Sequence, residues 1–228
     1  MGKILPNKQN NNSNSLSVAA RRRQREREER YQTILKAAET LFSRDGYHQT
    51  SINQIAELAE VSVGTVYFYF KNKEDLLIQL LDEISYLLRK MVGAEFRKTE
   101  ASLDGFMRAG KVFFSDFCRL HPEKVTIMYR ESVGQSPLVS EHIKKIQDKI
   151  GSDIIDALER VAENTGQGFP GEKTAEIIST SILGIYDYIA SKYLFSGDYA
   201  VDIDTVGDDA VNFLIGGIQH LCNLESNK

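Results

Sequence analysis

Side chains suited to chemistry concentrate in one short segment, residues 51–70, which reads SINQIAELAEVSVGTVYFYF. A helix turns by about 100° per residue, so when Val66 points inward, Gly64 and Phe68 point outward. The glycine permits close approach of a partner backbone, and the hydroxyl and methyl groups of the neighbouring Thr65 suit base edges and the thymine methyl. These residue types at this spacing predict a surface that contacts DNA.

Four aromatic residues in succession end the segment. On the same helical wheel Phe70 belongs to the core and Tyr69 to its boundary. Tyr67 and Phe68 are displayed. Aromatic clusters at helical spacing are usually core, so packing on another helix of the same domain is the alternative interpretation. Lys73 lies near the start of the following helix, against the preference for acidic residues there, and a DNA phosphate close by would explain its position.

The segment divides into two short helices with clear start signals. Ser51 is an N-cap, and Gln54 three residues later completes a capping box. Ser62 is a second N-cap, with Thr65 in the corresponding position. Two helices joined by so tight a turn form a helix-turn-helix unit, whose second helix can enter the major groove of DNA.

Residues 31–80 resemble the DNA-binding domain of TetR-type bacterial transcriptional repressors, on the segments LFSRDGYHQTS, INQIAELAEVSVGTVYFYF and KNKEDLL. The resemblance implies a recognition helix from Ser62 to Tyr69 that reads double-stranded operator DNA. The family commonly has glycine where this chain has Glu60, and a left-handed backbone there would cost about 1 kcal/mol. The DNA-contacting residues predicted from the motif and the resemblance are Tyr47, Thr50, Ser51, Ser62, Val63, Gly64, Thr65, Tyr67, Phe68, Tyr69 and Lys73.

The composition is that of an ordinary soluble globular protein, with 42% hydrophobic and 26% charged residues. The net charge is −4, but residues 1–75 hold 12 Lys and Arg against 9 Asp and Glu, and residues 76–228 hold 16 against 23. The basic excess therefore coincides with the DNA-binding motif. The sequence shows neither a signal-peptide core nor an apolar stretch that could span a bilayer, so we expect a cytoplasmic protein without membrane contact.

An enzyme is the alternative from another functional class. The four histidines are scattered along the chain without metal-ligand spacing or a nucleophile motif. The segment GQGFPG lies between expected helices rather than after a strand, so its glycines indicate a turn and not a phosphate-binding loop. We therefore expect no enzymatic activity, cofactor or metal. A helical protein-interaction module is the third possibility, and the outward face of residues 51–70 argues against it.

Helical apolar spacing recurs along the chain, and alternating strand patterns are absent, so we predict an all-α fold. Residues 1–26 are predicted to form a disordered polar and basic arm. Residues 27–87 form a three-helix DNA-binding head, whose first helix spans about 29–44, and residues 88–228 form a helical body for effector binding and dimerisation. The arginines of residues 21–30 interleave with glutamates, which fits either a solvated extension of the first helix or an arm that reaches DNA.

One long helix is expected from Lys73 towards Arg97, as the mechanical link between head and body. The helices expected after it span about 102–121, 123–131, 138–163, 172–195 and 204–222. The last two are apolar on most sides, which predicts cover on both faces. Tight packing within one chain would provide that cover. The family resemblance favours a homodimer through these two helices, with Gly217 or Ile218 at the contact.

Aromatic and apolar residues are dense in the segments behind the head. Part of one set is predicted to line an apolar pocket of about 300–1,000 Å³, with a filled core as the alternative for each single residue. The set is Phe106, Phe113, Phe117, Met128, Tyr129, Ile182 and Tyr186.

The control expected from this pocket is mechanical. A ligand there would displace the helix that begins at Lys73 and change the separation of two recognition helices. The head is particularly similar to the fatty-acid-metabolism regulators of the family, which respond to acyl-CoA. The predicted function is therefore a ligand-responsive repressor, released from its operator by an apolar small molecule, with a fatty acyl compound such as an acyl-CoA as the leading candidate for the effector.

Overall fold

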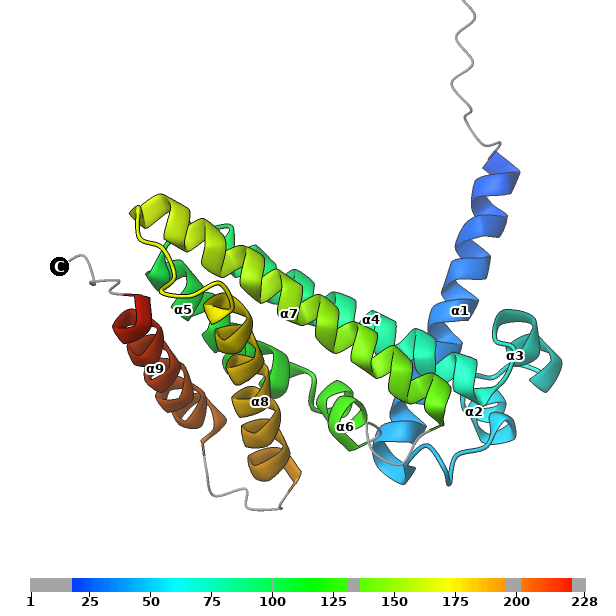
Figure 1. Cartoon of the computed structure of the whole chain (residues 1–228). Helices are drawn as coiled ribbons and strands as arrows, with labels where there is room; N and C mark the ends of the chain where they lie inside the picture. Colours follow the sequence, from blue (N-terminus) through cyan, green and yellow to red (C-terminus); the bar gives the residue numbers. More distant parts are fainter. Residues whose placement is uncertain (1–17, 100, 131–135, 196–201, 223–228) are drawn as a thin grey trace, which may run out of the picture.

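The computed structural model describes residues 18–99, 101–130, 136–195 and 202–222, and every regular element within these ranges is helical (Figure 1). The predicted all-α class is therefore confirmed. The elements are α1 (Val18–Asp45), α2 (Ile52–Leu58), α3 (Val63–Tyr69), α4 (Lys73–Phe96), α5 (Leu103–Val112), η1 (Phe113–Cys118), α6 (Pro122–Arg130), α7 (Pro137–Thr165), α8 (Thr174–Phe195) and α9 (Ile203–Cys222).

Helices α1, α2 and α3 form the head around one apolar core. Ile34, Phe42, Ile55 and Val66 are all fully buried there. Both predicted N-caps are confirmed: the Ser51 and Gln54 side chains bond each other's backbone N–H groups, and the Ser62 hydroxyl accepts from the Thr65 backbone N–H at 3.0 Å. Each cap satisfies a backbone donor that a short helix cannot pair internally. The sequence therefore fixes where the two helices of the motif begin.

The turn between α2 and α3 passes through a left-handed residue. Glu60 has φ 53°, and among the described residues it is the one non-glycine residue with positive φ. Its backbone N–H bonds the Glu57 carbonyl, and the next N–H, from Val61, bonds the Ala56 carbonyl. These hydrogen bonds end α2 in a tight turn that brings α3 beside it. The left-handed backbone of Glu60 is part of this turn, and a residue other than glycine is strained there.

Replacing this residue with glycine is expected to stabilise the protein. Glycine adopts positive φ without the Cβ clash, so Glu60→Gly should raise the free energy of unfolding by about 1 kcal/mol. Urea unfolding followed by circular dichroism measures the change. Glu57→Gly is the matched control, because Glu57 lies on the exposed face of α2 with helical backbone. The control should lose about 1 kcal/mol, and a loss in both variants would contradict the assignment of strain to Glu60.

The long helix α4 runs continuously from the head into the body (Figure 1). Asn72 caps its start, and the buried residues that hold it in place are Leu76, Leu77, Leu80, Leu81, Ile84, Ser85 and Leu88. It packs against α1 in the head and against α5 and α7 in the body. The boundary predicted between residues 87 and 88 therefore falls inside one rigid helix, so head and body share an element.

The last part of the predicted N-terminal arm is helical. Helix α1 begins at Val18, so residues 18–26 are helical, and the prediction of disorder is wrong for them. An ion pair of 2.8 Å between Arg22 and Glu26, one turn apart, supports the extension. The interpretation of residues 21–30 as an exposed continuation of the first helix is confirmed, and contact of these arginines with DNA stays a prediction. Residues 1–17 lie outside the described residues.

A π-helical segment interrupts the helix that was expected from 102 to 121. It packs its aromatic face into the core, with Phe114 and Phe117 almost fully buried. A Cβ added at Gly207 of α9 would lie 2.5 Å from Phe114, so the glycine allows α9 to approach this segment closely. Burial raises the pKa of the Cys118 thiol in the same segment to about 12. In the described part of the chain no helix has the length and apolar character needed to cross a membrane.

Candidate functional site

Helix α3 displays its aromatic residues as the helical wheel predicts. Val66 and Phe70 are buried, and Tyr69 is half-buried. Tyr67 is 53% exposed and Phe68 is 69% exposed. Two large rings on a short polar segment form an unusual surface for a soluble protein, and the flanking exposed residues Val63 and Gly64 leave it open to a flat partner.

Helix α1 supports this surface from behind. The Tyr31 ring stacks on Phe70 with centroids 5.1 Å apart and lies 6.3 Å from Tyr69. The Arg27 guanidinium carbon lies 5.8 Å from the centre of the Phe68 ring. A positive charge therefore lies beside the displayed rings, and sequence reasoning had not paired Arg27 with α3. The adjacent cation favours a negatively charged partner such as the phosphate backbone.

The hydroxyl groups of the motif serve the caps as well as the surface. The Ser51 hydroxyl donates to Gln54 Oε1 at 2.8 Å. The Ser62 and Thr65 hydroxyl oxygens lie 2.8 Å apart. A hydroxyl group has one donor and two acceptor sites, so these side chains retain capacity for a DNA contact. The structure places both serines at the exposed start of their helices, as predicted, while their contact with DNA stays a prediction.

Two residues of the predicted DNA-contacting set, Thr50 and Lys73, make structural contacts within the head. Thr50 is 2% exposed, and its hydroxyl donates to the Gly46 carbonyl at 2.8 Å, so its side chain cannot reach DNA. Lys73 Nζ donates to the Tyr47 and Thr50 carbonyls, each at 2.8 Å, and lies 4.3 Å from the centre of the Tyr47 ring. These carbonyls explain a lysine at a helix start without a DNA phosphate. Lys73 therefore positions the turn before α2, and its contact with a phosphate stays a prediction.

Removing the Tyr67 hydroxyl tests whether the exposed surface of α3 contacts a DNA phosphate. Tyr67→Phe should weaken operator binding about 10-fold, because a hydrogen bond to a charged phosphate is lost while the exposed ring remains. The slope of affinity against salt concentration should not change, because no positive charge is removed. Fluorescence anisotropy with labelled operator DNA at several salt concentrations measures both quantities. Tyr86→Phe is the control, since Tyr86 is also exposed, at 63%, but lies on α4. Equal affinities for both variants would contradict the phosphate contact.

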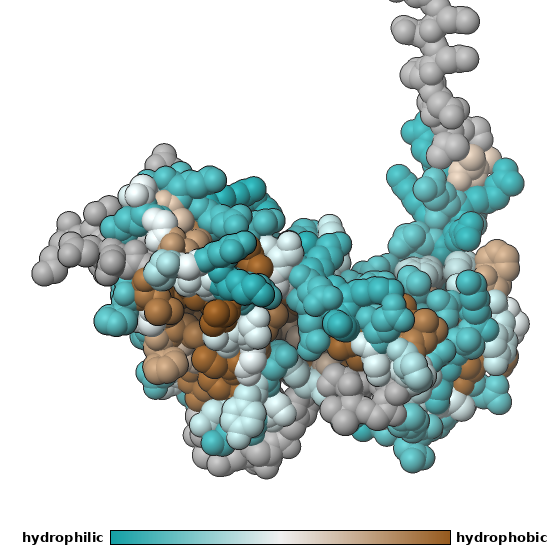
Figure 2. Space-filling view, in the orientation of Figure 1, coloured by the Kyte–Doolittle hydropathy of each residue, from teal (hydrophilic) through white to brown (hydrophobic). Residues whose placement is uncertain are grey.

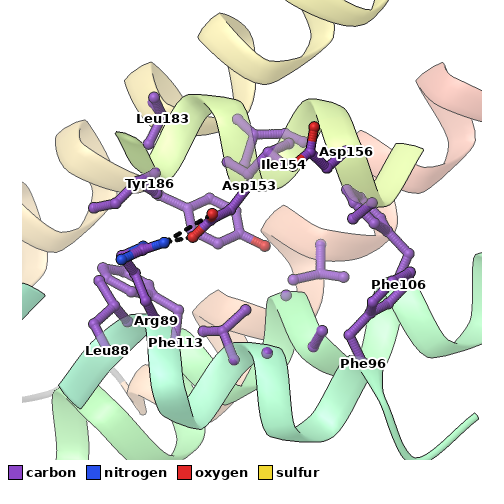
Figure 3. Close-up of a pocket in the computed structure, with 18 of the residues that line it drawn as sticks. Leu88, Arg89, Phe96, Phe106, Phe113, Asp153, Ile154, Asp156, Leu183 and Tyr186 are labelled. Atoms are coloured by element: carbon purple, nitrogen blue, oxygen red, sulfur yellow. Dashed lines mark hydrogen bonds and ion pairs between the residues drawn. The ribbon is translucent and has the colours of Figure 1, made fainter. Parts of the chain in front are cut away.

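A cavity of about 530 Å³ lies in the body among α4, α5, α6, α7, α8 and α9, with an aromatic and aliphatic interior (Figure 3). Six residues of the predicted set line it: Phe106, Phe113, Met128, Tyr129, Ile182 and Tyr186. Phe117 does not, and its inclusion was wrong. Its ring is fully buried and stacks on Phe113 with centroids 6.1 Å apart, because the π-helical segment turns it into the core.

The cavity also has charged residues that sequence reasoning missed. Arg89 of α4 and Asp153 of α7 form a two-bonded ion pair across the wall, with Nε–Oδ2 and Nη2–Oδ1 distances of 2.5 and 2.9 Å (Figure 3). Lys90, Arg97 and Arg160 line the cavity and are exposed to solvent, so they lie where it opens. The exposed Asp156 also lines it, so the cations outnumber the free carboxylates there. An apolar interior with a basic opening suits a ligand that has an apolar part and an anionic part.

Two polar side chains bond each other within the apolar wall. The Tyr129 hydroxyl donates to Asp187 Oδ1 at 3.0 Å. Burial raises the pKa of Asp187, and the hydrogen bond from Tyr129 opposes that shift. Burial, followed by the charge of Asp187, raises the pKa of Tyr129 well above its usual value. Burial thus shifts both groups towards their neutral forms, and their hydrogen bond joins α6 to α8.

Helices α8 and α9 expose an apolar face (Figure 2). Its large side chains are Ile177, Tyr188, Phe213 and Leu221, which are 48–74% exposed. No described atom outside the local helix lies within 4 Å of a Cβ built at Gly184, Gly216 or Gly217. Glycines on an uncovered helix face permit close approach of a second backbone. Ile218, expected at a dimer contact, is instead 2% exposed in the core of its own chain.

The described residues contain no group of three or more His, Cys, Asp or Glu side chains that could hold a metal ion. A family model described as bacterial regulatory proteins, tetR family, matches residues 34–80. That range covers the end of α1, both helices of the motif and the start of α4.

Similar proteins extend the match beyond the head. The HTH-type transcriptional repressor NicS of Pseudomonas putida is 30% identical over 176 residues, which are 75% of this chain and 80% of that protein. The fatty acid metabolism regulator protein of Bacillus subtilis is 48% identical over 54 residues, 24% of this chain and 28% of that one. The structure of a regulator FadR from Bacillus subtilis with stearoyl-CoA superposes with a TM-score of 0.72 at 21% identity, covering 82% of this chain and 98% of that chain.

Proposed function

This chain belongs to the TetR family of bacterial transcriptional regulators, and we propose that it is a repressor released from its operator by an acyl-coenzyme A. As a member of the family it is a DNA-binding regulator. The displayed rings of α3, with Arg27 beside them, form the surface that this activity requires. The similar repressor NicS supports the direction of control.

The observation that carries the ligand class is the chemistry of the cavity. A volume of about 530 Å³ falls within the usual range for ligand sites. The apolar interior suits an acyl chain, and the basic residues at the opening suit the phosphates of coenzyme A. A relative with the same fold was solved with stearoyl-CoA, and the head is similar to a fatty acid metabolism regulator. An acyl-CoA has both an apolar chain for the interior and phosphates for the basic opening.

The exposed face of α8 and α9 supports a homodimer. Two copies would bury Tyr188, Phe213 and their neighbours against each other and bring the open glycines into contact. A two-fold dimer also presents two recognition helices to two half-sites, which a single seven-residue helix cannot do. A second copy of the same chain is therefore the partner that would cover this apolar face.

Two helices connect the cavity to the head. Helix α4 contributes Leu88 and Arg89 to the cavity and, through Lys73 at its other end, holds the turn before α2. Helix α6 contributes Met128 and Tyr129, and its other residues hold α1. A ligand that shifts either helix moves the recognition helices, and half-sites about 34–36 Å apart tolerate little movement. Coupling of about 1–3 kcal/mol between ligand and DNA would change occupancy 5–150-fold.

The proposal is tested by DNA binding in the presence of candidate effectors. The full chain is titrated onto DNA from upstream of its own gene, and long-chain acyl-CoA, coenzyme A and the free fatty acid are added separately. Release by acyl-CoA alone is the expected result. Binding that none of the three compounds alters would contradict the effector, and absence of salt-dependent DNA binding would favour an interaction module.

A further inference from the structure

Tyr186 of α8 stands out among the residues of the cavity. Its ring packs against Phe113 and Phe114, with centroids 5.2 and 4.8 Å apart. The ring is therefore held by aromatic contacts from the π-helical segment. Its hydroxyl points into the cavity (Figure 3). Burial raises the pKa of this hydroxyl, so it is a neutral O–H group throughout the physiological range.

The hydroxyl of Tyr186 has no hydrogen-bond partner among the described residues, and the contacts of this side chain are those of its ring. Tyr129, another tyrosine of the cavity lining, bonds Asp187. Tyr186 is half-buried, so its hydroxyl is accessible from the cavity, and polar groups away from bulk water almost always have a partner. A phenol O–H that faces a cavity can find its partner in the molecule that occupies the cavity.

The space around the hydroxyl depends on a glycine of α5. A Cβ built at Gly110 would lie 2.6 Å from the Tyr186 hydroxyl oxygen and 3.6 Å from a Val211 methyl carbon. The first distance is shorter than any tolerated contact, so a larger residue at Gly110 would force the hydroxyl to move. The glycine thus reserves the position of this hydroxyl in the cavity wall.

We propose that the Tyr186 hydroxyl donates a hydrogen bond to the carbonyl oxygen of the acyl ligand, and so makes the site specific for an acyl group rather than for a hydrocarbon chain. The inference rests on the proposed function and deepens it. A carbonyl lies between the apolar chain and the charged end of an acyl-CoA. The Tyr186 hydroxyl is a neutral donor in a cavity that has both apolar and basic lining residues, so it can meet such a carbonyl. Sites that offer a hydrogen bond discriminate against ligands that cannot make it.

The experiment compares two ligands that differ only in the carbonyl group. Calorimetric titration measures binding of palmitoyl-CoA and of the S-hexadecyl thioether of coenzyme A, which has the same chain length but no carbonyl. The unmodified protein should bind palmitoyl-CoA about tenfold more tightly. Tyr186→Phe, which keeps the ring contacts, should lose that difference by weakening palmitoyl-CoA alone. Tyr193→Phe is the matched control on α8, because Tyr193 does not line the cavity.

A second variant tests the space instead of the donor. Gly110→Ala keeps the phenol but displaces it, so it should also remove the preference for the carbonyl. Equal affinity of the unmodified protein for both ligands would overturn the inference while leaving the proposed effector intact, and this comparison needs no variant to fold. Failure of the unmodified protein to bind either coenzyme A derivative would overturn the proposed function itself, and the inference with it.

Discussion

Phe213→Glu is expected to convert the protein to a monomer and to weaken operator binding by about 10²–10⁴-fold, the usual contribution of linking two binding modules. Phe213 is 74% exposed at the centre of α9, so the substitution leaves the core of the chain untouched. In a homodimer through α8 and α9, each copy would bury one carboxylate in the interface. Burying a charge without a partner is strongly unfavourable.

Light scattering and DNA titration measure the two effects on the same sample. The variant should have the mass of one chain, 25.7 kDa, and the unmodified protein twice that mass. Leu138→Glu is the matched control, because Leu138 is 57% exposed at the start of α7, away from the α8 and α9 face. A dimeric Phe213→Glu variant, or a monomeric unmodified protein, would contradict the interface. Monomers from both variants would mean that charge anywhere on the surface disrupts the assembly.

The second large effect is expected where α6 meets α1. Glu39 of α1 is buried, and its carboxylate bonds Lys36 at 2.7 Å and Lys124 of α6. Arg130, also on α6, donates to the Phe42 carbonyl. Lys124→Met should lower the free energy of unfolding by about 2 kcal/mol, because a buried carboxylate loses a charged hydrogen-bond donor and keeps only the exposed Lys36.

A double substitution separates this pair from general damage to the core. Glu39→Leu with Lys124→Met removes both charges, so it should recover most of the stability that Lys124→Met loses. Lys145→Met is the control, since the Lys145–Glu141 pair of 2.8 Å is exposed and should contribute almost nothing. Urea unfolding of these four proteins and of the single Glu39→Leu variant supplies the values. Losses that simply add in the double variant would contradict a coupled pair.

The same pair predicts the sign of a pH dependence. Burial alone would raise the pKa of Glu39, but the hydrogen bonds and charges of Lys124 and Lys36 outweigh it, and the pKa lies below its ordinary value. A carboxyl with a lowered folded pKa stabilises the protein above its unfolded pKa of about 4.3 and loses this contribution as the pH falls through the folded pKa. The stability lost in Lys124→Met should therefore be constant above about pH 5 and shrink below it.

Local patterns in the sequence were sufficient for the motif of the head. The wheel centred on Val66 correctly assigned Phe70 to the core and Tyr67 to the surface. Seven residues make about two helical turns, which is enough to define the buried face of a helix. The caps at Ser51 and Ser62 are equally local, since each bonds a residue three positions away. Elements of this kind depend on neighbours in the chain, and the sequence displays those neighbours directly.

The missed features depend on residues far apart in the chain. Arg89 and Asp153 are 64 positions apart, Glu39 and Lys124 are 85 apart, and Lys73 bonds carbonyls 23 and 26 positions away. The spacing of apolar residues along a helix does not indicate such contacts. The error at Phe117 has a related cause, because a π-helical turn rotates the following side chains away from the positions that an α-helical wheel assigns.

The buried thiol of Cys118 is an internal probe for local opening of the body. A thiol with a pKa near 12 and no exposure reacts with maleimides only after the surrounding core has opened. In a variant with Cys222 replaced by serine, the labelling rate of Cys118 therefore counts openings of the π-helical segment that supports the cavity wall. Fluctuations of the body become measurable in this way without tryptophan, which the chain lacks.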